Sequence, residues 1–408
     1  VGLYDCNRSM TYPSSTPEDV LERYESHPDV DSKHLETAKQ FCLRRIQENI
    51  EPFADHFPSA SSENLYYEAS DLEGWTPSFW SGMLWLAYET TDKDAYRSVA
   101  ESQLPRFADR LETEDVIGHD IGFLYTLSAI ASSMLTDNPA SEQMALDAAD
   151  RLTERYWPDP GIIQAWGDPA EPEATDWGQW AHGRIIADTM MNLPLLFMAS
   201  IATEDDQYHE IATNHAENTA RYLVRDDGST FHTYKFDVTT GAPIGGETFQ
   251  GFADNSCWSR GQAWIIYGLA LAARYTDEEA FLQTAVDVAD FYLKHLPEDH
   301  VPRWDFRAPE ADDVRDSSAA AIAACGLFEL SSHFDVGTTQ RSVYENAAVT
   351  TLGSLTESYT TESSDSNGIL KEGTYNKPNG DYGECCIWGD YFYFEGLVRA
   401  TSDWESYW

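Results

Sequence analysis

Amphipathic helical patterns fill most of the 408-residue chain, and they constrain its fold more than any other feature. Apolar residues recur at i, i+3 and i+4 spacing, as in the segment 280–293, and this spacing is typical of helices that bury one face. The chain is therefore predicted to be all-α. The predicted helices cover 31–55, 77–91, 93–111, 120–135, 138–157, 183–202, 206–225, 256–275, 277–296, 316–334, 338–357 and 387–402.

Short, similar connections join these helices in pairs. In each, an apolar helix end is followed by Thr and acidic residues suited to capping the next helix; the connections are 88–95, 135–139, 201–206 and 275–280. This weak internal repeat indicates helical hairpins, with the last helix, 387–402, left to pair with 31–55. Six hairpins favour an (α/α)6 barrel, with short joints at one end and long loops at the other. An open solenoid is the structural alternative. We expect a single catalytic domain over 1–408, with 1–30 as an N-terminal extension.

The charge of the chain is strongly negative. Seventy acidic residues face 26 basic ones, a formal net charge of −44, and 42% of the residues are hydrophobic. A disordered acidic protein would lack so many apolar residues, so the composition predicts a folded core under an acidic surface, as in cytoplasmic proteins of salt-accumulating halophiles. Such a charge argues against nucleic acid or anionic membranes as partners.

The cysteines and the apolar runs bear on the compartment. None of the six cysteines forms a CxxC pair, which favours buried free thiols in a reducing cytoplasm. No apolar run reaches the roughly 18 residues that a membrane span needs. Residues 1–8 lack the apolar segment of a signal peptide, so none is expected.

The long loops are rich in Trp, Gly, Pro and Asp, and loops on a rigid scaffold commonly carry function. They cover 56–76, 112–119, 158–182, 226–255, 297–315 and 358–386, and the stretch 231–241 alternates like a β-hairpin. In a barrel, the first helices of the hairpins would begin at one common mouth. Their starts carry Trp75 and Trp80, His119 and Asp120, His182 and Asp188, Trp258 and Arg260, Asp316, and Trp388 and Asp390.

Each of these residues also has a purely structural interpretation. Asp120 and Asp316 could be helix N-caps, and Asp390 a first-turn acid. Trp80 and Trp85 are expected in the core. Trp258 and Trp264 could also be core residues, with Arg260 paired to a neighbouring carboxylate.

Asp188 is the sharpest candidate, because it lies in a nearly all-apolar segment predicted to be helical. Burial of an unpaired carboxyl is costly and raises its pKa, which suits a general acid. The structural alternative is an ion pair with Arg184, one turn away.

Other chemistries lack their motifs. The segment 209–215 only approaches the zinc motif HExxH, and the chain has no Gly-rich phosphate loop, no GxSxG and no Cys/His cluster. Tryptophans with acids point instead to carbohydrate, since sugar rings stack on aromatic faces and carboxyls transfer protons. A sugar epimerase would want a pair of catalytic histidines, whereas a glycan-binding protein would need no buried Asp188.

Several of these motifs resemble those of glycoside hydrolase family 88, the unsaturated glucuronyl hydrolases. The resemblance spans nearly the whole chain in motif order: WTPSFWSGMLWLAYE at 75–89, HDIGF at 119–123, IADTMMNL at 186–193, WSRGQAW at 258–264, DSSAA at 316–320 and WGDY at 388–391. The family's fold is an (α/α)6 barrel, which agrees with the helix pattern.

The resemblance implies roles residue by residue. Asp188 matches the general acid/base, and Asp120 matches a second essential aspartate. The implied substrate-binding positions are Trp75, His119, Trp166, His232, Gln250, Trp258, Arg260 and Trp264. One position departs from the family: Phe249 stands where a His often precedes the Gln-Gly step.

The implied reaction is hydration of the C4=C5 vinyl ether of a terminal unsaturated uronic acid, left on oligosaccharides by polysaccharide lyases. Asp188 would protonate C4 and assist water at C5, with no metal or redox cofactor. An unsaturated rhamnogalacturonyl hydrolase, with a different leaving sugar, and a non-catalytic glycan-binding protein are the alternatives.

Overall fold

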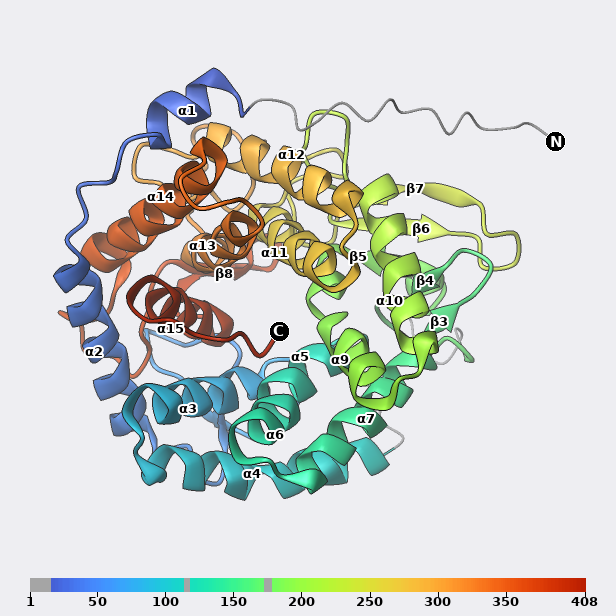
Figure 1. Ribbon diagram of the computed structural model, residues 1–408, viewed down its shortest axis with the longest axis horizontal. Coiled ribbons are helices and arrows are strands. Elements are labelled where there is room, and N and C mark those ends of the chain that lie inside the picture. Colours follow the sequence, from blue (N-terminus) through green and yellow to red (C-terminus); the bar gives the residue numbers. More distant parts are fainter. Residues whose placement is uncertain (1–15, 114–117, 172–177) are drawn as a thin grey trace.

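Helices arranged in two concentric layers make up the molecule (Figure 1). The computed structural model describes residues 16–113, 118–171 and 178–408. The inner layer consists of α3 (Pro77–Thr91), α5 (Ile121–Tyr125) continuing through the π-helical turn η1 (Thr126–Ile130) into α6 (Ala131–Thr136), α9 (Pro194–Thr203), α11 (Ser259–Thr276), α13 (Ser317–Ser332) and α15 (Ile387–Thr401). Because α15 packs against α3, the inner ring closes. The predicted (α/α)6 barrel is confirmed, and the open solenoid is excluded.

The outer layer alternates with the inner one along the chain. It consists of α2 (Ser32–Asn49), α4 (Asp94–Glu112), α7 (Pro139–Thr153), α10 (Asp206–Asn218) with the π-helical turn η3 (Thr219–Leu223), α12 (Glu279–His295), and α14 (Thr339–Ser354) with the π-helical turn η4 (Leu355–Tyr359). Burial follows the layers: α11 is buried on all sides from Ser259 to Ala273, whereas α12 keeps one exposed face. A helix that is apolar all round needs cover on all sides, and the outer layer supplies it.

The four similar joints share one backbone geometry. At each of these four joints the inner helix ends at an acidic residue with a left-handed backbone: Asp92 (φ 55°), Asp137 (φ 52°), Glu204 (φ 57°) and Asp277 (φ 55°). This conformation ends a helix and lets the chain reverse. The joint threonines were expected to cap the next helix, but their hydroxyls donate to carbonyls four residues back in their own helix. These residues are Thr91, Thr136, Thr203 and Thr276.

The predicted helix 183–202 is wrong in its first half. Arg184–Ile186 form the strand β5, and Ala187–Met191 form the 3₁₀ turn η2, so that helix α9 begins only at Pro194. Proline has no amide N–H for a helix interior but suits the first helical position. The β-branched Ile185 and Ile186 pair instead with Tyr234 and Thr233.

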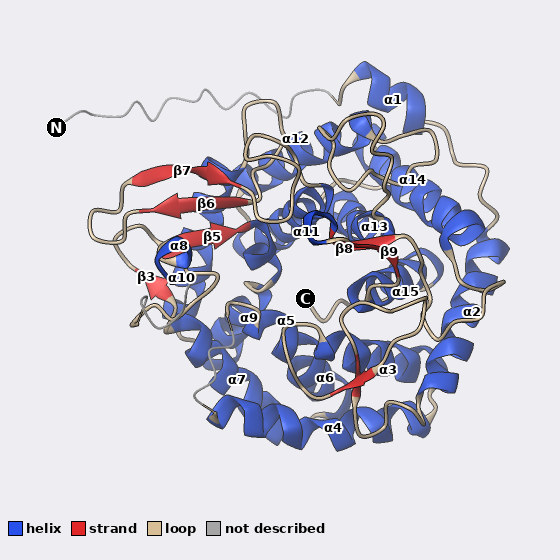
Figure 2. Ribbon diagram, turned by 180° about the vertical axis from the view of Figure 1, so that it is seen from behind, coloured by secondary structure: helices blue, strands red, loops and turns tan. Residues whose placement is uncertain are grey.

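The long-loop end carries short strands. The hairpin predicted in 231–241 is found with other bounds: β6 (Thr233–Phe236) lies in this stretch, but its partner β7 (Pro243–Glu247) lies beyond it. Strand β5 extends the hairpin to three antiparallel strands. Further pairs are β1 (Phe57–Pro58) with β2 (Ala69–Ser70), β3 (Tyr156–Trp157) with β4 (Ile162–Ile163), and β8 (Gly373–Asn376) with β9 (Asp381–Glu384). Figure 2 shows the three-stranded sheet beside the barrel and the β8–β9 hairpin near its centre. Short helical segments are α1 (Glu18–Tyr24), α8 (Gly178–Ala181) and η5 (Lys377–Asn379).

Segment 403–408 closes the barrel axis at the short-joint end, and its end lies at the centre of the ring (Figures 1 and 2). Trp408 is fully buried, and its ring stacks on Phe392 with centroids 5.8 Å apart. Its indole N–H donates to Glu395 at 2.9 Å. Segment 403–408 therefore fills the barrel at its short-joint end.

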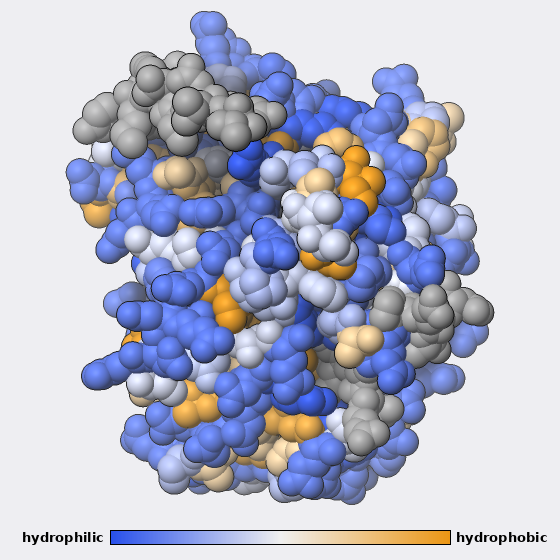
Figure 3. Space-filling model, turned by 90° about the vertical axis from the view of Figure 1, so that its right-hand side faces the viewer, coloured by the Kyte–Doolittle hydropathy of each residue, from blue (hydrophilic) through white to orange (hydrophobic). Residues whose placement is uncertain are grey.

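Hydrophilic side chains cover most of the face shown in Figure 3. Helix α1 packs outside the barrel against α12 and α14. Of the predicted extension 1–30, residues 1–15 lie outside the described part, as does Cys6. The other five cysteines are buried and free, as expected. Within the described ranges, no helix is long and apolar enough to cross a membrane.

Candidate active site

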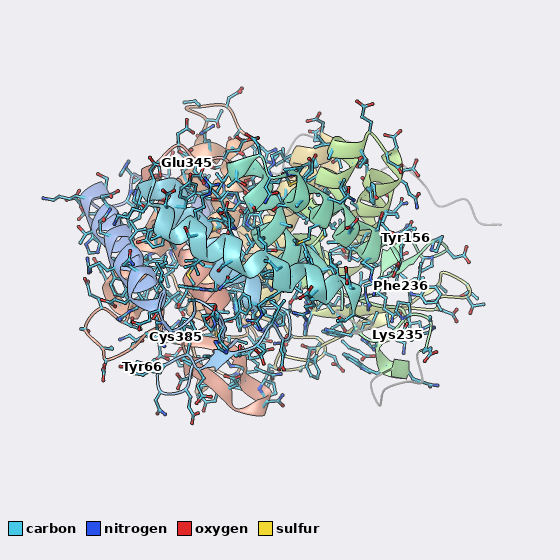
Figure 4. The ribbon with its side chains drawn as sticks, turned by 90° about the horizontal axis from the view of Figure 1, so that it is seen from below. Tyr66, Tyr156, Lys235, Phe236, Glu345 and Cys385 are labelled. Atoms are coloured by element: carbon cyan, nitrogen blue, oxygen red, sulfur yellow. The ribbon has the colours of Figure 1, made fainter. Side chains whose placement is uncertain are left out.

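A cavity of about 400 Å³ lies at the long-loop end, where the inner helices begin. This end faces down in Figure 4, with Tyr66 and Cys385 of the long loops toward the bottom and Glu345 toward the top. The lining residues are Trp75, His119, Asp120, Trp166, Ile186, Asp188, Phe249, Gln250, Arg260, Tyr375, Asn376, Asn379 and Asp381. Four of the six predicted helix starts therefore contribute residues to the lining, whereas Asp316, Trp388 and Asp390 of the other two do not. Seven of the ten predicted site residues lie in the lining.

Asp188 lies in the cavity wall on the turn η2. It is 9% exposed, and its Oδ1 has no hydrogen-bond partner among the described residues. Burial raises the pKa of Asp188 to about 6, against the opposing charge of Arg260. The alternative of a pair with Arg184 is wrong, because that guanidinium binds Glu247 at 3.0 Å. Asp188 is thus an unpaired carboxyl open to a ligand.

Asp120 occupies the N-cap position of α5 but does not act as a cap. Within the described structure its side chain makes no capping hydrogen bond, and it remains 17% exposed. Burial, and then the charge of Asp188, raise the pKa of Asp120 to about 8. The structural interpretation therefore fails for Asp120.

The structural interpretation does hold for the two other acids at the barrel mouth. Asp316 caps α13 by accepting from the amides of Ser318 and Ala319. Asp390 accepts from the amides of Ile369 and Leu370.

Two histidines support the cavity in their neutral forms. His119 is buried, with Nε2 3.5 Å from Oδ1 of Asp120, and burial lowers the pKa of His119 well below its usual range. His232 lies behind the lining, where its Nδ1 accepts from the amides of Phe249 at 3.0 Å and Gln250 at 3.2 Å. Burial lowers the pKa of His232 to about 3. His232 thus holds the loop that carries Gln250.

Arg260 lines the cavity and also holds the fold. It is 1% exposed and pairs with the buried Asp316 at 3.2 Å, as the structural interpretation expected. Its guanidinium also donates to the carbonyls of Thr374 and Tyr375, the latter at 2.8 Å. Arg260 therefore fixes strand β8 against the start of α11.

Besides His232, two further predicted substrate contacts do not line the cavity. Trp264 is fully buried in the barrel core, where it packs against Phe123 and Phe392 at centroid distances of 5.2 and 5.4 Å. Trp258 is 2% exposed and lies between His232 and Arg260. A residue near the start of an inner helix can face either the mouth or the core, and the motif alone does not tell which.

Trp75 and Trp166 form aromatic walls of the cavity. Trp75 donates its indole N–H to the hydroxyl of Tyr375 at 3.3 Å, and Trp166 stacks on Trp180 with centroids 5.4 Å apart. Apolar rings and two aspartates with raised pKa thus face one space, an arrangement suited to proton transfer on a sugar ring.

Comparison with known proteins agrees with this geometry. The sequence profile of Glycosyl Hydrolase Family 88 matches residues 49–405. The chain belongs to this family. It is a glycoside hydrolase.

Family 88 relatives cover nearly the full chain. The chain is 42% identical over 367 residues to the unsaturated glucuronyl hydrolase of Bacillus sp. (strain GL1), and the match covers 88% of this chain and 95% of that one. It is 37% identical over 391 residues to the unsaturated chondroitin disaccharide hydrolase of Streptococcus pneumoniae (strain ATCC BAA-255 / R6), covering 95% and 97%. The structure of the unsaturated glucuronyl hydrolase of Streptococcus agalactiae superposes with a TM-score of 0.90 at 35% identity, over 97% and 98% of the two chains.

Sequence reasoning missed one side of this family 88 cavity. Tyr375, Asn376, Asn379 and Asp381 come from the β8–β9 hairpin, within a stretch assigned only as the long loop 358–386. The available signal was a polar turn, Asn376 to Asp381, between residues that pair as strands. Phe249, noted as a departure from the family, also lines the cavity and is 37% exposed.

Proposed function

We propose that this cavity removes the terminal 4,5-unsaturated uronic acid from lyase-generated oligosaccharides, with Asp188 as proton donor and Asp120 as its partner. The observation that carries the proposal is the pair of carboxyls with raised pKa in one cavity, between aromatic walls. Relatives named for unsaturated glucuronyl and chondroitin disaccharide substrates support the substrate class.

The reaction consumes one water. Asp188 gives a proton to C4 of the vinyl ether, and the positive charge that develops at C5 is shared by the ring oxygen. Water adds to C5 and returns a proton to the aspartate pair. The resulting hemiketal opens to a ketone, and the hemiacetal left at C1 then releases the leaving sugar. No step breaks the glycosidic bond directly.

The carboxyl pair suits these reaction steps because it holds one proton at neutral pH. The pKa of Asp188 is raised to about 6 and that of Asp120 to about 8, so between these values the pair holds one proton, which Asp120 carries in the resting site. Transfer of this proton from Asp120 to Asp188 makes Asp188 the acid for C4, and the charged pair then accepts the proton that water returns. A single carboxyl would lack one of these two functions.

The uronate needs positive or neutral donors in a chain of net charge −44. Arg260 is the one cationic residue among the described residues that line the cavity. Gln250 lies in the same lining, and its amide donates to the carbonyl of Tyr375 at 2.8 Å. We assign this side to the carboxylate of the sugar, and the walls Trp75 and Trp166 to its ring faces.

We further propose that residues 1–408 form one catalytic domain that works in the salt-rich cytoplasm of a halophile. The net charge of −44 and the five buried free thiols support this setting. The closed helical ring, into which segment 403–408 is packed, supports the single domain.

Asp188→Asn tests the function. The variant keeps the size of the side chain but has no transferable proton, so kcat should fall by roughly 10²–10⁴-fold while unsaturated disaccharide still binds. Turnover is followed by the loss of the ultraviolet absorbance of the double bond, and binding by calorimetry.

Asp290→Asn is the matched control. Asp290 is also a buried carboxyl, 6% exposed with its pKa raised to about 7, but it lies on the outer helix α12 and outside the cavity lining. It should keep the wild-type kcat. A fully active Asp188→Asn would overturn the proposed mechanism.

A further inference from the structure

Helix α5 is capped by a residue from another segment. At its start, the amide N–H of Phe123 donates to Oδ1 of Asn192 at 2.7 Å. An aspartate at the N-cap position ordinarily takes this bond itself, as Asp316 does for α13. Asp120 holds the N-cap position of α5, and its carboxylate takes no such bond within the described structure. Asn192 therefore stands in for Asp120 as the cap.

The same asparagine holds the turn that carries Asp188. Its Nδ2 donates to the backbone carbonyl of Asp188 at 3.1 Å, and the whole residue is buried. One side chain thus bonds both segments that carry the proposed catalytic carboxyls. The two segments are 69 residues apart at the Phe123–Asn192 bond.

Backbone packing at this junction leaves no room for adjustment. A Cβ added at Gly122 would lie 2.3 Å from Cα of Asn192 and 2.5 Å from its carbonyl oxygen. Only glycine fits here, so the first turn of α5 rests directly on the backbone of Asn192. The hydrogen bonds of Asn192 are made across a contact that cannot slide.

We propose that Asn192 is a positioning residue, which caps α5 so that the carboxylate of Asp120 stays free in the cavity at a fixed place relative to Asp188. The inference rests on the proposed function. Without Asn192, the N–H of Phe123 needs a new acceptor, and the carboxylate of Asp120 is the side chain placed to supply one. Asp120 would then turn from the cavity into the cap.

This change has an electrostatic signature. A carboxylate that accepts amide N–H bonds at a helix N-terminus is favoured in its charged form, so its pKa falls. Asp120 now faces Asp188, which raises its pKa, and Arg155 and Arg110, which lower it, beside neutral His119 and Tyr375. If the carboxylate of Asp120 capped α5, the amide N–H bonds would lower the pKa of Asp120 further, an effect that is absent in the wild-type protein.

The test compares Asn192→Ala with Gln103→Ala. Gln103 is an equally buried amide, which donates to the carbonyl of Phe53 at 3.0 Å and accepts from Ser81 at 3.1 Å, but it lies on the outer helix α4. Both variants should lower the melting temperature. Only Asn192→Ala should lower kcat, by roughly 10–100-fold, because small misplacements of catalytic groups have such effects. It should also move the basic limb of the pH profile toward acid by at least about one unit.

A lower melting temperature of Asn192→Ala, with kcat and the basic limb of the pH profile as in the wild type, would overturn the inference. If Asn192→Ala does not fold, Asn192→Asp replaces it, because this variant keeps the oxygen that accepts from Phe123. The basic limb of the pH profile of Asn192→Asp should lie at the same pH as in the wild type or at a higher pH. A shift of this limb toward acid would contradict the inference. Activity in Asp188→Asn would instead reject the proposed function itself, so the two failures are distinguishable.

Discussion

At the residue scale, four aspartates near the mouth of the barrel differ only in their partners. Asp316 and Asp390 accept hydrogen bonds from backbone amides of other residues, whereas in the described structure Asp120 caps no helix and Oδ1 of Asp188 has no partner. The sequence identified the burial of Asp188 from its apolar neighbours. It could not separate Asp120 from an ordinary N-cap, because the side chain that replaces it, Asn192, comes from a distant segment.

The pH dependence of activity follows from this carboxyl pair. The singly protonated pair is the active form, so kcat/KM should rise as pH increases through about 6 and fall as it increases through about 8. Below the lower value both carboxyls are protonated and none accepts a proton from water. Above the upper value neither can protonate C4. A pH-independent kcat/KM between pH 5 and pH 9 would contradict the assignment; the measurement is the profile on an unsaturated disaccharide.

At the element scale, local patterns predicted the regular helices well. The segment 77–91 is found as α3 with the same bounds, because its periodicity and its proline at the first helical position are local signals. Elements fixed by distant partners were missed: β5 depends on pairing with β6, and β8 is held by Arg260 from 115 residues away. The side of the cavity that carries Tyr375 was therefore absent from the prediction.

Arg260→Lys tests how much β8 depends on this contact. The family resemblance implies a substrate-binding role for Arg260, and its pair with Asp316 and its bonds to β8 add a structural one. Lysine keeps the charge and loses the fork of donors. The free energy of unfolding should fall by about 2 kcal/mol, as for a lost hydrogen bond to a charged group, and KM should rise because Tyr375 and Gln250 shift together.

The matched control is Arg307→Lys at the exposed pair with Asp227, which should change stability by less than about 1 kcal/mol. Equal, small losses in the free energy of unfolding of both variants would show that the buried guanidinium of Arg260 does not anchor β8. Denaturant unfolding and steady-state kinetics measure the two effects.

At the scale of the whole molecule, the repeat of helical joints predicted the ring, and the composition predicted its acidic exterior. The closing of the barrel floor by Trp408 was not predictable, since a short polar segment that ends in aromatic residues has no periodic pattern. The burial of Trp408 depends on Phe392 and Glu395, which α15 places around the barrel axis.

The net charge of −44 predicts that stability depends on salt. At about 1 M salt the Debye length is about 3 Å, so repulsion between surface carboxylates is screened, whereas in dilute buffer it destabilises the compact state. Helical circular dichroism and activity should both be lost on dialysis into dilute buffer and be retained at molar salt. Equal melting temperatures in the two conditions would count against the halophilic setting.

The central claim is that the enzyme hydrates the double bond rather than cleaving the glycosidic bond directly, and its most direct test is turnover of an unsaturated disaccharide in heavy water. Protonation by Asp188 delivers a solvent-derived hydron to C4, so the account predicts that the product carries deuterium at C4, with loss of the ultraviolet-absorbing double bond as the sugar is released. A product without deuterium at C4, released while the double bond is still intact, would contradict it.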